Sequence, residues 1–168
     1  MTNYLLCVLT LTELFSLKAS ESYIENRVKP VYVERLGVCL QIAEKAETQG
    51  VDPVHAVALA YQESAFNENV VSSAGAVGAM QVLPWYACPR GRSNCDLCNK
   101  KTGVCDWVTA GLRAMLVWKK HFNKLKDTLC HYNAGWKCNK RSRVYARAIM
   151  RRIKRLRVQL AVSRDFEP

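Results

Sequence analysis

The sequence predicts a mainly helical domain, and three observations lead to this prediction. Few segments alternate apolar and polar residues with period two, as a half-buried strand would. The run 54–61 is apolar apart from His55, which is typical of a helix buried on all sides. Near the C-terminus the apolar residues recur at spacings of 4, 3 and 4: Ile149, Ile153, Leu156 and Leu160. With 168 residues, of which 49% are hydrophobic and 23% charged, the chain has the size and composition of one globular domain.

The N-terminal segment has two interpretations. Residues 5–17 are mostly apolar but too few to span a bilayer, and 17–19 offer a small-residue cleavage site. We therefore expect a signal peptide over residues 1–20 and one catalytic domain over 21–168, so that the protein is exported to the periplasm or the extracellular space. The alternative is a packed N-terminal helix, because no Lys or Arg precedes the apolar run and Glu13 interrupts it.

The remaining elements follow from caps and breakers. After a polar, extended stretch over 21–30, a helix is predicted over 31–48, with Val38, Ile42 and Ala46 on one face and Gly50 as its stop. Asp52 is a natural N-cap and Pro53 suits a first helical position, so the next helix runs over 53–64. The segments predicted beyond it are a loop with a hairpin-like piece over 67–84, an insertion over 85–103, a helix from Asp106 to about Asn123, another over 124–132, and a terminal helix over 142–162.

The cysteine pattern is typical of an exported protein. The eight cysteines are Cys7, Cys39, Cys88, Cys95, Cys98, Cys105, Cys130 and Cys138. The four over 88–105 lie in a polar segment that needs a staple, and the spacing favours two disulfides over a four-cysteine zinc site, since the outer gaps of six residues are unlike paired zinc knuckles. Cys130 and Cys138 bracket residues 131–137, although a bridge from Cys39 to Cys130 is an alternative. Cleavage of a leader would remove Cys7 and leave three disulfides and one free thiol.

The net charge of +11 is concentrated in one segment. Residues 140–157 contain nine Lys or Arg in eighteen and no acid. We expect a terminal helix that docks its apolar stripe and solvates its charged face. The functional alternative is peripheral contact with a membrane or an anionic wall through this basic helix. Nucleic acid is not an expected partner, because no recognised binding module accompanies the charge.

Glu63 is the candidate catalytic residue. It lies at the C-terminal end of the apolar helix, where desolvation and the negative end of the helix dipole both disfavour a carboxylate anion. A carboxyl that keeps its proton near neutral pH can serve as a general acid. The following small-residue run, 72–79, contains Gly75 and Gly78, which allow tight turns and close approach of a ligand.

Three ordered motifs resemble the soluble lytic transglycosylase family, which has a lysozyme-like catalytic domain. The motifs are Glu63-Ser64, then Gly78-Ala79-Met80-Gln81 with Pro84, then His131-Tyr132-Asn133-Ala134-Gly135. The helix pattern Trp107-Val108-x-x-Gly111-Leu112-x-x-Met115 lies between the last two, and the resemblance covers about Val38 to Gly135. The chain departs from the family at Ala79, where a larger residue is usual, and at His131, where alanine is usual.

The resemblance implies cleavage of peptidoglycan glycan strands between MurNAc and GlcNAc by a single glutamic acid, with a 1,6-anhydro product and no metal or organic cofactor. Glu63 would then be the acid and base. Ser64 would support its carboxylate or the N-acetyl group, Gly78, Met80 and Gln81 would line the sugar subsites, and Tyr132 and Asn133 would position Glu63 or the sugar. Two alternatives remain: a lysozyme-type hydrolase that uses Asp52 or Glu68 to activate water, and a non-catalytic glycan-binding protein. A secretion, conjugation or pilus apparatus and a phage particle are the expected settings, the last with a virion-associated location.

Overall fold

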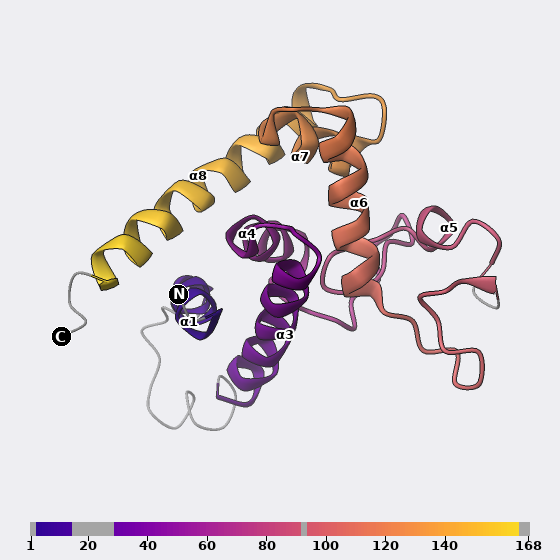
Figure 1. The fold of residues 1–168 in the computed structure, drawn as a ribbon, viewed down its shortest axis with the longest axis horizontal. Coiled ribbons are helices and arrows are strands. Elements are labelled where there is room, and N and C mark those ends of the chain that lie inside the picture. The colour runs from indigo at the N-terminus through magenta and orange to yellow at the C-terminus, as the bar shows by residue number, and fades with distance from the viewer. Residues whose placement is uncertain (1–2, 15–28, 92–93, 165–168) are drawn as a thin grey trace.

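The computed structural model describes residues 3–14, 29–91 and 94–164 as an assembly of helices (Figure 1). The helices are α1 (Asn3–Leu14), α3 (Lys29–Thr48), α4 (Pro53–Ser64), α5 (Pro84–Ala87), α6 (Trp107–His121), α7 (Leu125–Ala134) and α8 (Lys140–Arg164). Extended pairing in these ranges is limited to isolated antiparallel bridges, including Val71–Val77 and Val77–Val82 in the loop after α4. The mainly helical fold class is therefore confirmed, and the hairpin-like piece is reduced to these bridges.

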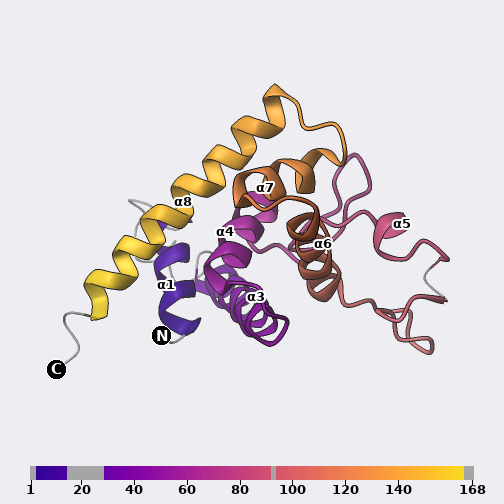
Figure 2. The same cartoon turned by 45° about the horizontal axis from the view of Figure 1, so that its top comes forward.

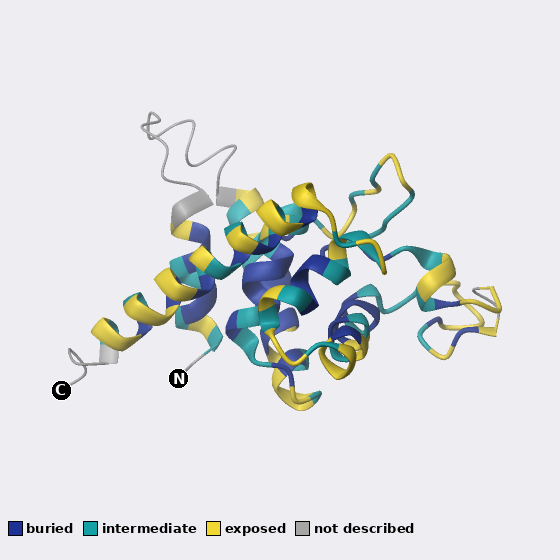
Figure 3. Ribbon diagram, turned by 90° about the horizontal axis from the view of Figure 1, so that it is seen from above, coloured by how far each residue is buried: buried dark blue, intermediate teal, exposed yellow. Residues whose placement is uncertain are grey.

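Helix α4 is the centre of the fold, with α1, α3 and α8 packed around it (Figure 2). It begins where predicted, because the Asp52 carboxylate accepts a hydrogen bond from the Val54 N–H at 2.8 Å and Pro53 follows the cap. The residues from Ala56 to Ala60 are all fully buried, as the dark ribbon at the centre of Figure 3 shows. The helix that carries Glu63 thus runs through the core of the domain.

Helices α1 and α3 cover one side of α4. The predicted face of α3, Val38, Ile42 and Ala46, is buried, and the helix begins two residues before the expected start. Residues 3–14 form α1, whose Leu6 and Leu11 are fully buried and whose Cys7 is joined to Cys39 of α3 by a disulfide. This segment belongs to the core of the described fold, and cleavage after residue 20 stays a prediction. Within the described ranges, none of the helices combines the length and apolarity needed to cross a membrane.

Helix α8 lies across α4, α7 and α1. Its predicted apolar stripe, Ile149, Ile153, Leu156 and Leu160, is buried, whereas many of its basic side chains face outward. At one point the helix is also tied by charge, because Arg157 donates a hydrogen bond to the Asp52 carboxylate at 2.8 Å. The expectation of a docked helix with a solvated basic face is therefore confirmed.

The cysteine-rich insertion projects from the helices beside α6 (Figure 1). It is stapled by two disulfides, as the spacing favoured, and the structure pairs Cys88 with Cys95 and Cys98 with Cys105. The zinc alternative is not supported, because sulfurs joined in disulfides cannot act as thiolate ligands.

Two further disulfides complete the pairing. Cys130 is joined to Cys138, so the alternative bridge from Cys39 to Cys130 is wrong; Cys39 is joined to Cys7 instead. All eight cysteines are paired. Loss of Cys7 with a leader would therefore leave Cys39 without its partner.

Candidate active site

The end of α4 is shaped by a strained turn that follows Glu63. Ala65 and Phe66 both have positive φ, 51° and 64°, in the left-handed region that non-glycine residues rarely adopt. Arg35 of α3 supports the turn by donating a hydrogen bond to the Ala65 carbonyl at 3.1 Å. Phe66 anchors it, since this side chain is fully buried and packs edge-on against Tyr61. The Arg35 hydrogen bond and the buried Phe66 ring thus fix the turn after α4 and, with it, the orientation of Glu63.

The Glu63 carboxyl lies largely out of water. Burial raises its pKa from an ordinary 4.5 to about 7, and a hydrogen bond donated by the Tyr145 hydroxyl to Oε1 opposes this rise by favouring the charged form. Desolvation, which the apolar helix predicts, is therefore the larger effect. A carboxyl with this pKa is protonated in about half of the molecules at pH 7, so it can both give and take a proton there.

Two tyrosines approach this carboxyl from different helices. Burial, and next the nearby Glu63 charge, hold the pKa of Tyr132 in α7 and of Tyr145 in α8 well above the ordinary value. Both hydroxyls therefore keep their protons and act as donors. Tyr145 donates to Glu63, and Tyr132 donates to the Met80 carbonyl at 2.8 Å. The second tyrosine hydroxyl thus ties the third motif to the second.

Tyr145 contacts the candidate acid but lies outside the three sequence motifs. It lies 82 residues after Glu63 in the chain and carries no local sign of chemistry. One signal was present: Tyr145 precedes Ile149 by four residues, so it continues the apolar stripe of α8 by one turn. A hydroxyl on a buried helical stripe needs a partner, and in this structure the partner is the Glu63 carboxyl.

The other motif polar groups hold the loop over 67–84 in place. The Ser64 hydroxyl donates to the Ala79 carbonyl at 2.8 Å and accepts from the Asn67 N–H at 3.0 Å. The Gln81 amide donates to the Gly78 and Val70 carbonyls at 2.9 and 3.2 Å. In the structure both side chains therefore satisfy backbone groups of the loop that runs beside Glu63.

Gly78 and Met80 form the side of this loop that packs on the core. Gly78 has a φ of 78°, and a Cβ there would lie 3.1 Å from the Trp107 Cβ, so the loop packs closely on the start of α6. The Met80 side chain is fully buried, and a Cβ on Gly111 would lie only 2.6 Å from the Met80 Cβ. The structure thus places Met80 in the core, where its side chain supports the loop from below. Asn133, by contrast, is exposed at the end of α7.

The acidic residues considered as a second carboxylate lie elsewhere. Asp52 caps the opposite end of α4, about 16 Å away along the helix at 1.5 Å per residue. Asp96 pairs with Arg113, and Asp106 caps α6 and pairs with Lys45. Glu68 is exposed. Among the described residues, no carboxylate contributes to the pKa of Glu63, so the site has one acid and two tyrosine hydroxyls.

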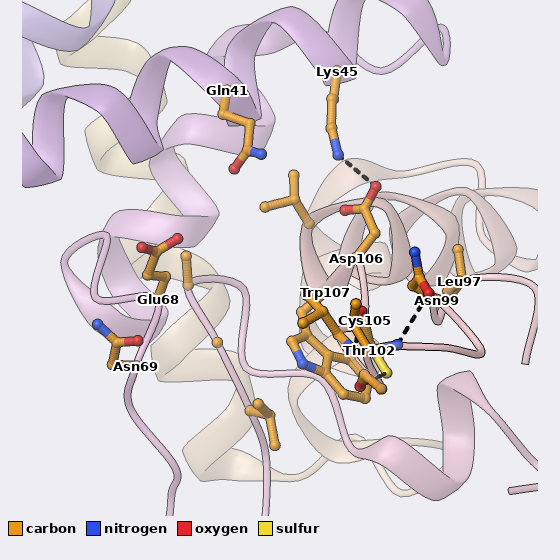
Figure 4. A pocket seen from close by; sticks show the side chains of 16 residues that line it. Gln41, Lys45, Glu68, Asn69, Leu97, Asn99, Thr102, Cys105, Asp106 and Trp107 are labelled. Carbon is orange, nitrogen blue, oxygen red and sulfur yellow. Dashed lines mark hydrogen bonds and ion pairs between the residues drawn. The ribbon is translucent and has the colours of Figure 1, made fainter. Parts of the chain in front are cut away.

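A cleft of about 950 Å³ lies between α3, the loop over 67–84, the cysteine-rich insertion and the start of α6 (Figure 4). Gln41 and Lys45 enter it from α3, Glu68 from the loop, and Asp106 and Trp107 from the start of α6. It shares Gly78 and Ala79 with the second motif, but Glu63, Gln81, Tyr132 and Tyr145 are not among its lining residues. The cleft therefore borders the loop over 67–84, whose Ala79 carbonyl accepts the Ser64 hydrogen bond, while the Glu63 side chain does not line it.

The comparison with protein families gives a match to the Transglycosylase SLT domain over residues 41–152. The match spans two thirds of the chain, and the chain therefore belongs to this family. It extends beyond Gly135 and includes Tyr145. The comparisons with curated proteins and with solved structures returned no match. Family membership makes the protein a lytic-transglycosylase type of enzyme that acts on the glycosidic bonds of peptidoglycan.

Proposed function

We propose that this protein cleaves the β-1,4 bond between MurNAc and GlcNAc and releases glycan ends that carry 1,6-anhydro-MurNAc, with Glu63 as the single acid and base. The observation that carries the proposal is the environment of Glu63. Its carboxyl is buried, has a pKa of about 7, accepts a hydrogen bond from a tyrosine and has no second carboxylate beside it among the described residues.

In the first step, the protonated Glu63 carboxyl donates its proton to the glycosidic oxygen as the bond from this oxygen to C1 of MurNAc breaks. GlcNAc leaves with a free 4-hydroxyl, and positive charge develops at C1. The carbonyl oxygen of the substrate's own N-acetyl group stabilises this charge, which is the task of the second carboxylate in most glycosidases. The raised pKa of Glu63 supports the step because it keeps the proton available near neutral pH.

In the second step, the Glu63 carboxylate accepts the proton of the MurNAc 6-hydroxyl while this oxygen forms a bond to C1. The ring closes without water, and Glu63 returns to its protonated form. The Tyr145 hydroxyl donates to Oε1 and so stabilises the carboxylate between the two steps. A pKa near 7 suits both roles, since neither protonation state of the carboxyl is strongly disfavoured at neutral pH.

The remaining motif residues form the frame of this centre. Tyr132 and Ser64 fix the loop over 67–84 through the Met80 and Ala79 carbonyls. Asn133 is exposed at the end of α7, so its amide is available to sugar hydroxyls and N-acetyl groups. The Gln81 side chain is partly exposed, and because its NH2 group donates to the Gly78 and Val70 carbonyls, its amide oxygen is the group that would accept from a sugar hydroxyl. The basic face of α8 would hold the exported enzyme near anionic wall polymers.

Mass spectrometry of the soluble products from purified sacculi tests the proposal. Products 18 Da lighter than hydrolytic muropeptides are expected, since ring closure replaces the addition of one water. Reducing-end products would instead show a hydrolase and require a base such as Glu68. Binding without release by a correctly oxidised protein would show a glycan-binding protein.

A further inference from the structure

An aromatic surface follows directly after the second and third motifs. Trp85 and Tyr86 lie in α5, immediately after Pro84, and Trp136 comes directly after Gly135. Trp118 of α6 lies between them and completes what is called here the aromatic strip: Trp85, Tyr86, Trp118 and Trp136. Its members come from three segments that are distant in sequence.

The rings of the strip are in continuous contact. Trp85 meets Tyr86 edge-on with ring centroids 5.8 Å apart, Tyr86 is stacked on Trp118 at 6.5 Å, and Trp118 meets Trp136 edge-on at 4.9 Å. Trp118 is buried at 3% exposure and forms the floor. Trp85, Tyr86 and Trp136 are 66%, 42% and 68% exposed and offer their rings to solvent. Such large aromatic side chains side by side at a surface mark a binding site more often than an inert one.

The strip is held rigid at both ends. The disulfide Cys88–Cys95 follows α5 directly, and Cys130–Cys138 encloses the loop that carries Trp136. His131 contacts the floor residue Trp118 with ring centroids 5.6 Å apart, is stacked on Phe122 at 4.0 Å, and has its Nδ1 2.7 Å from the Gly135 carbonyl oxygen. His131 stands where the family usually has alanine, so this departure becomes part of the support for the strip. A surface ordered before binding loses little entropy when a ligand arrives.

We propose that the aromatic strip binds the peptidoglycan glycan strand beyond the cleavage point, as a stacking platform for its sugar rings. This inference rests on the proposed function. A pyranose ring presents C–H groups on its faces and hydroxyls at its rim, so it packs on an indole while its polar groups stay in water. The exposed Lys120 and Lys137 neighbour the strip in sequence and complement the carboxylates of the stem peptides.

Continuity with the catalytic centre favours a glycan strand over other partners. Tyr132 is bonded to the Met80 carbonyl, Trp136 lies four residues after Tyr132, and Trp85 lies five residues after Met80. The residues that directly follow the second and third motifs therefore come together at the strip, where Trp118 contacts both Tyr86 and Trp136. A polymeric substrate that passes Glu63 continues beyond it, and the strip begins where the two motifs end.

The test compares glycan binding in a background that does not turn over. In a Glu63→Gln protein, the double change Trp85→Ala and Trp136→Ala is expected to weaken binding to long glycan strands by about tenfold or more, which corresponds to about 1.4 kcal/mol per factor of ten. Binding of a short chitooligosaccharide that fills the catalytic centre alone should not change. Val33→Ala is the control, because Val33 is an exposed apolar residue, at 61%, on α3 and lies outside both the strip and the predicted signal peptide.

A conservative variant separates ring chemistry from folding. The double change Trp85→Phe and Trp136→Phe keeps an aromatic face and should retain most of the binding. Unchanged affinity for long strands in the folded alanine variant would overturn the inference and leave the strip as a surface for a protein partner. If the phenylalanine variant bound as weakly as the alanine variant, the stacking argument would also fail. If the unaltered enzyme released no products from sacculi, the proposed function itself would fail, and the strip with it.

Discussion

Replacement of Glu63 by glutamine tests the central argument through both activity and stability. Glutamine keeps the size of the side chain and an oxygen that accepts the Tyr145 hydrogen bond, but it has neither an acidic proton to donate nor a basic carboxylate to accept one. Loss of a general acid typically costs about 10²–10⁴ in rate, and here one group serves both steps, so turnover of sacculi should fall by at least this factor. Release of soluble muropeptides above one tenth of the original rate would contradict the assignment.

The same change should stabilise the protein above neutral pH. The Glu63 pKa is higher in the fold, at about 7, than its ordinary 4.5, so between these values the unfolded chain releases a proton that the folded protein retains. The free energy of unfolding therefore falls with rising pH in this window. At 1.36 kcal/mol per pKa unit, the full cost of ionising the buried carboxyl is about 3 kcal/mol. The glutamine side chain is neutral at every pH tested, so the variant does not lose this free energy of unfolding as the pH rises.

Thermal unfolding at two pH values measures the effect. Near pH 4 the carboxyl is largely protonated in both states, so the variant and the original protein should unfold at similar temperatures. Near pH 8 the variant should unfold about 6–12 °C higher, given about 2–4 °C per kcal/mol for a domain of this size. Glu68→Gln is the matched control, because it makes the same chemical change on an exposed side chain. Equal unfolding temperatures of the Glu63 variant and the original at both pH values would refute the burial argument, and loss of activity in the Glu68 variant would favour the hydrolase.

Three further predictions concern the frame of the site. Gly111→Ala should lower the free energy of unfolding by about 1–3 kcal/mol in urea titrations, because the added Cβ would clash with Met80. Gly37→Ala is the control: Gly37 lies in another helix with open space around it, so this variant should not be destabilised. Equal effects of the two changes would contradict the packing of Gly111 on Met80. Tyr145→Phe removes the hydrogen bond that lowers the Glu63 pKa, so the alkaline limb of kcat/KM should move to higher pH while kcat falls about tenfold or more; an unmoved limb would count against this contact. The packing of α1 leads us to expect that the folded protein retains Cys7, so labelling of the denatured, unreduced protein should find no free thiol, whereas one reactive thiol would indicate a cleaved leader.

The local parts of the fold followed from sequence because their causes are local. Asp52 and Pro53 define the start of α4, and Asp106 defines the start of α6, through hydrogen bonds within three residues. The spacing of apolar residues in α8 likewise predicted which face is buried. The candidate acid was also found locally, since an apolar helix that ends in Glu63 desolvates its carboxyl whichever helices surround it.

The groups that complete the site depended on contacts between distant segments. Tyr145 donates a hydrogen bond to Glu63 although 82 residues of sequence separate them. Met80 was expected at the sugar subsites, but its side chain packs in the core against Gly111 of α6. The disulfide partner of Cys39 also depended on a contact between distant segments, because α1 packs on α3 and places Cys7 next to Cys39.

The sequence by itself determined a helical domain of this family, the helix that carries Glu63 and the desolvation that raises its pKa. Only the tertiary structure decided which hydroxyl contacts that carboxyl, which cysteines pair and which aromatic rings meet beside the motifs. The physical reason is the range of the interactions. Caps, helical periodicity and burial along one helix act within a few residues, whereas hydrogen bonds, disulfides and ring contacts between elements exist only once packing brings them together.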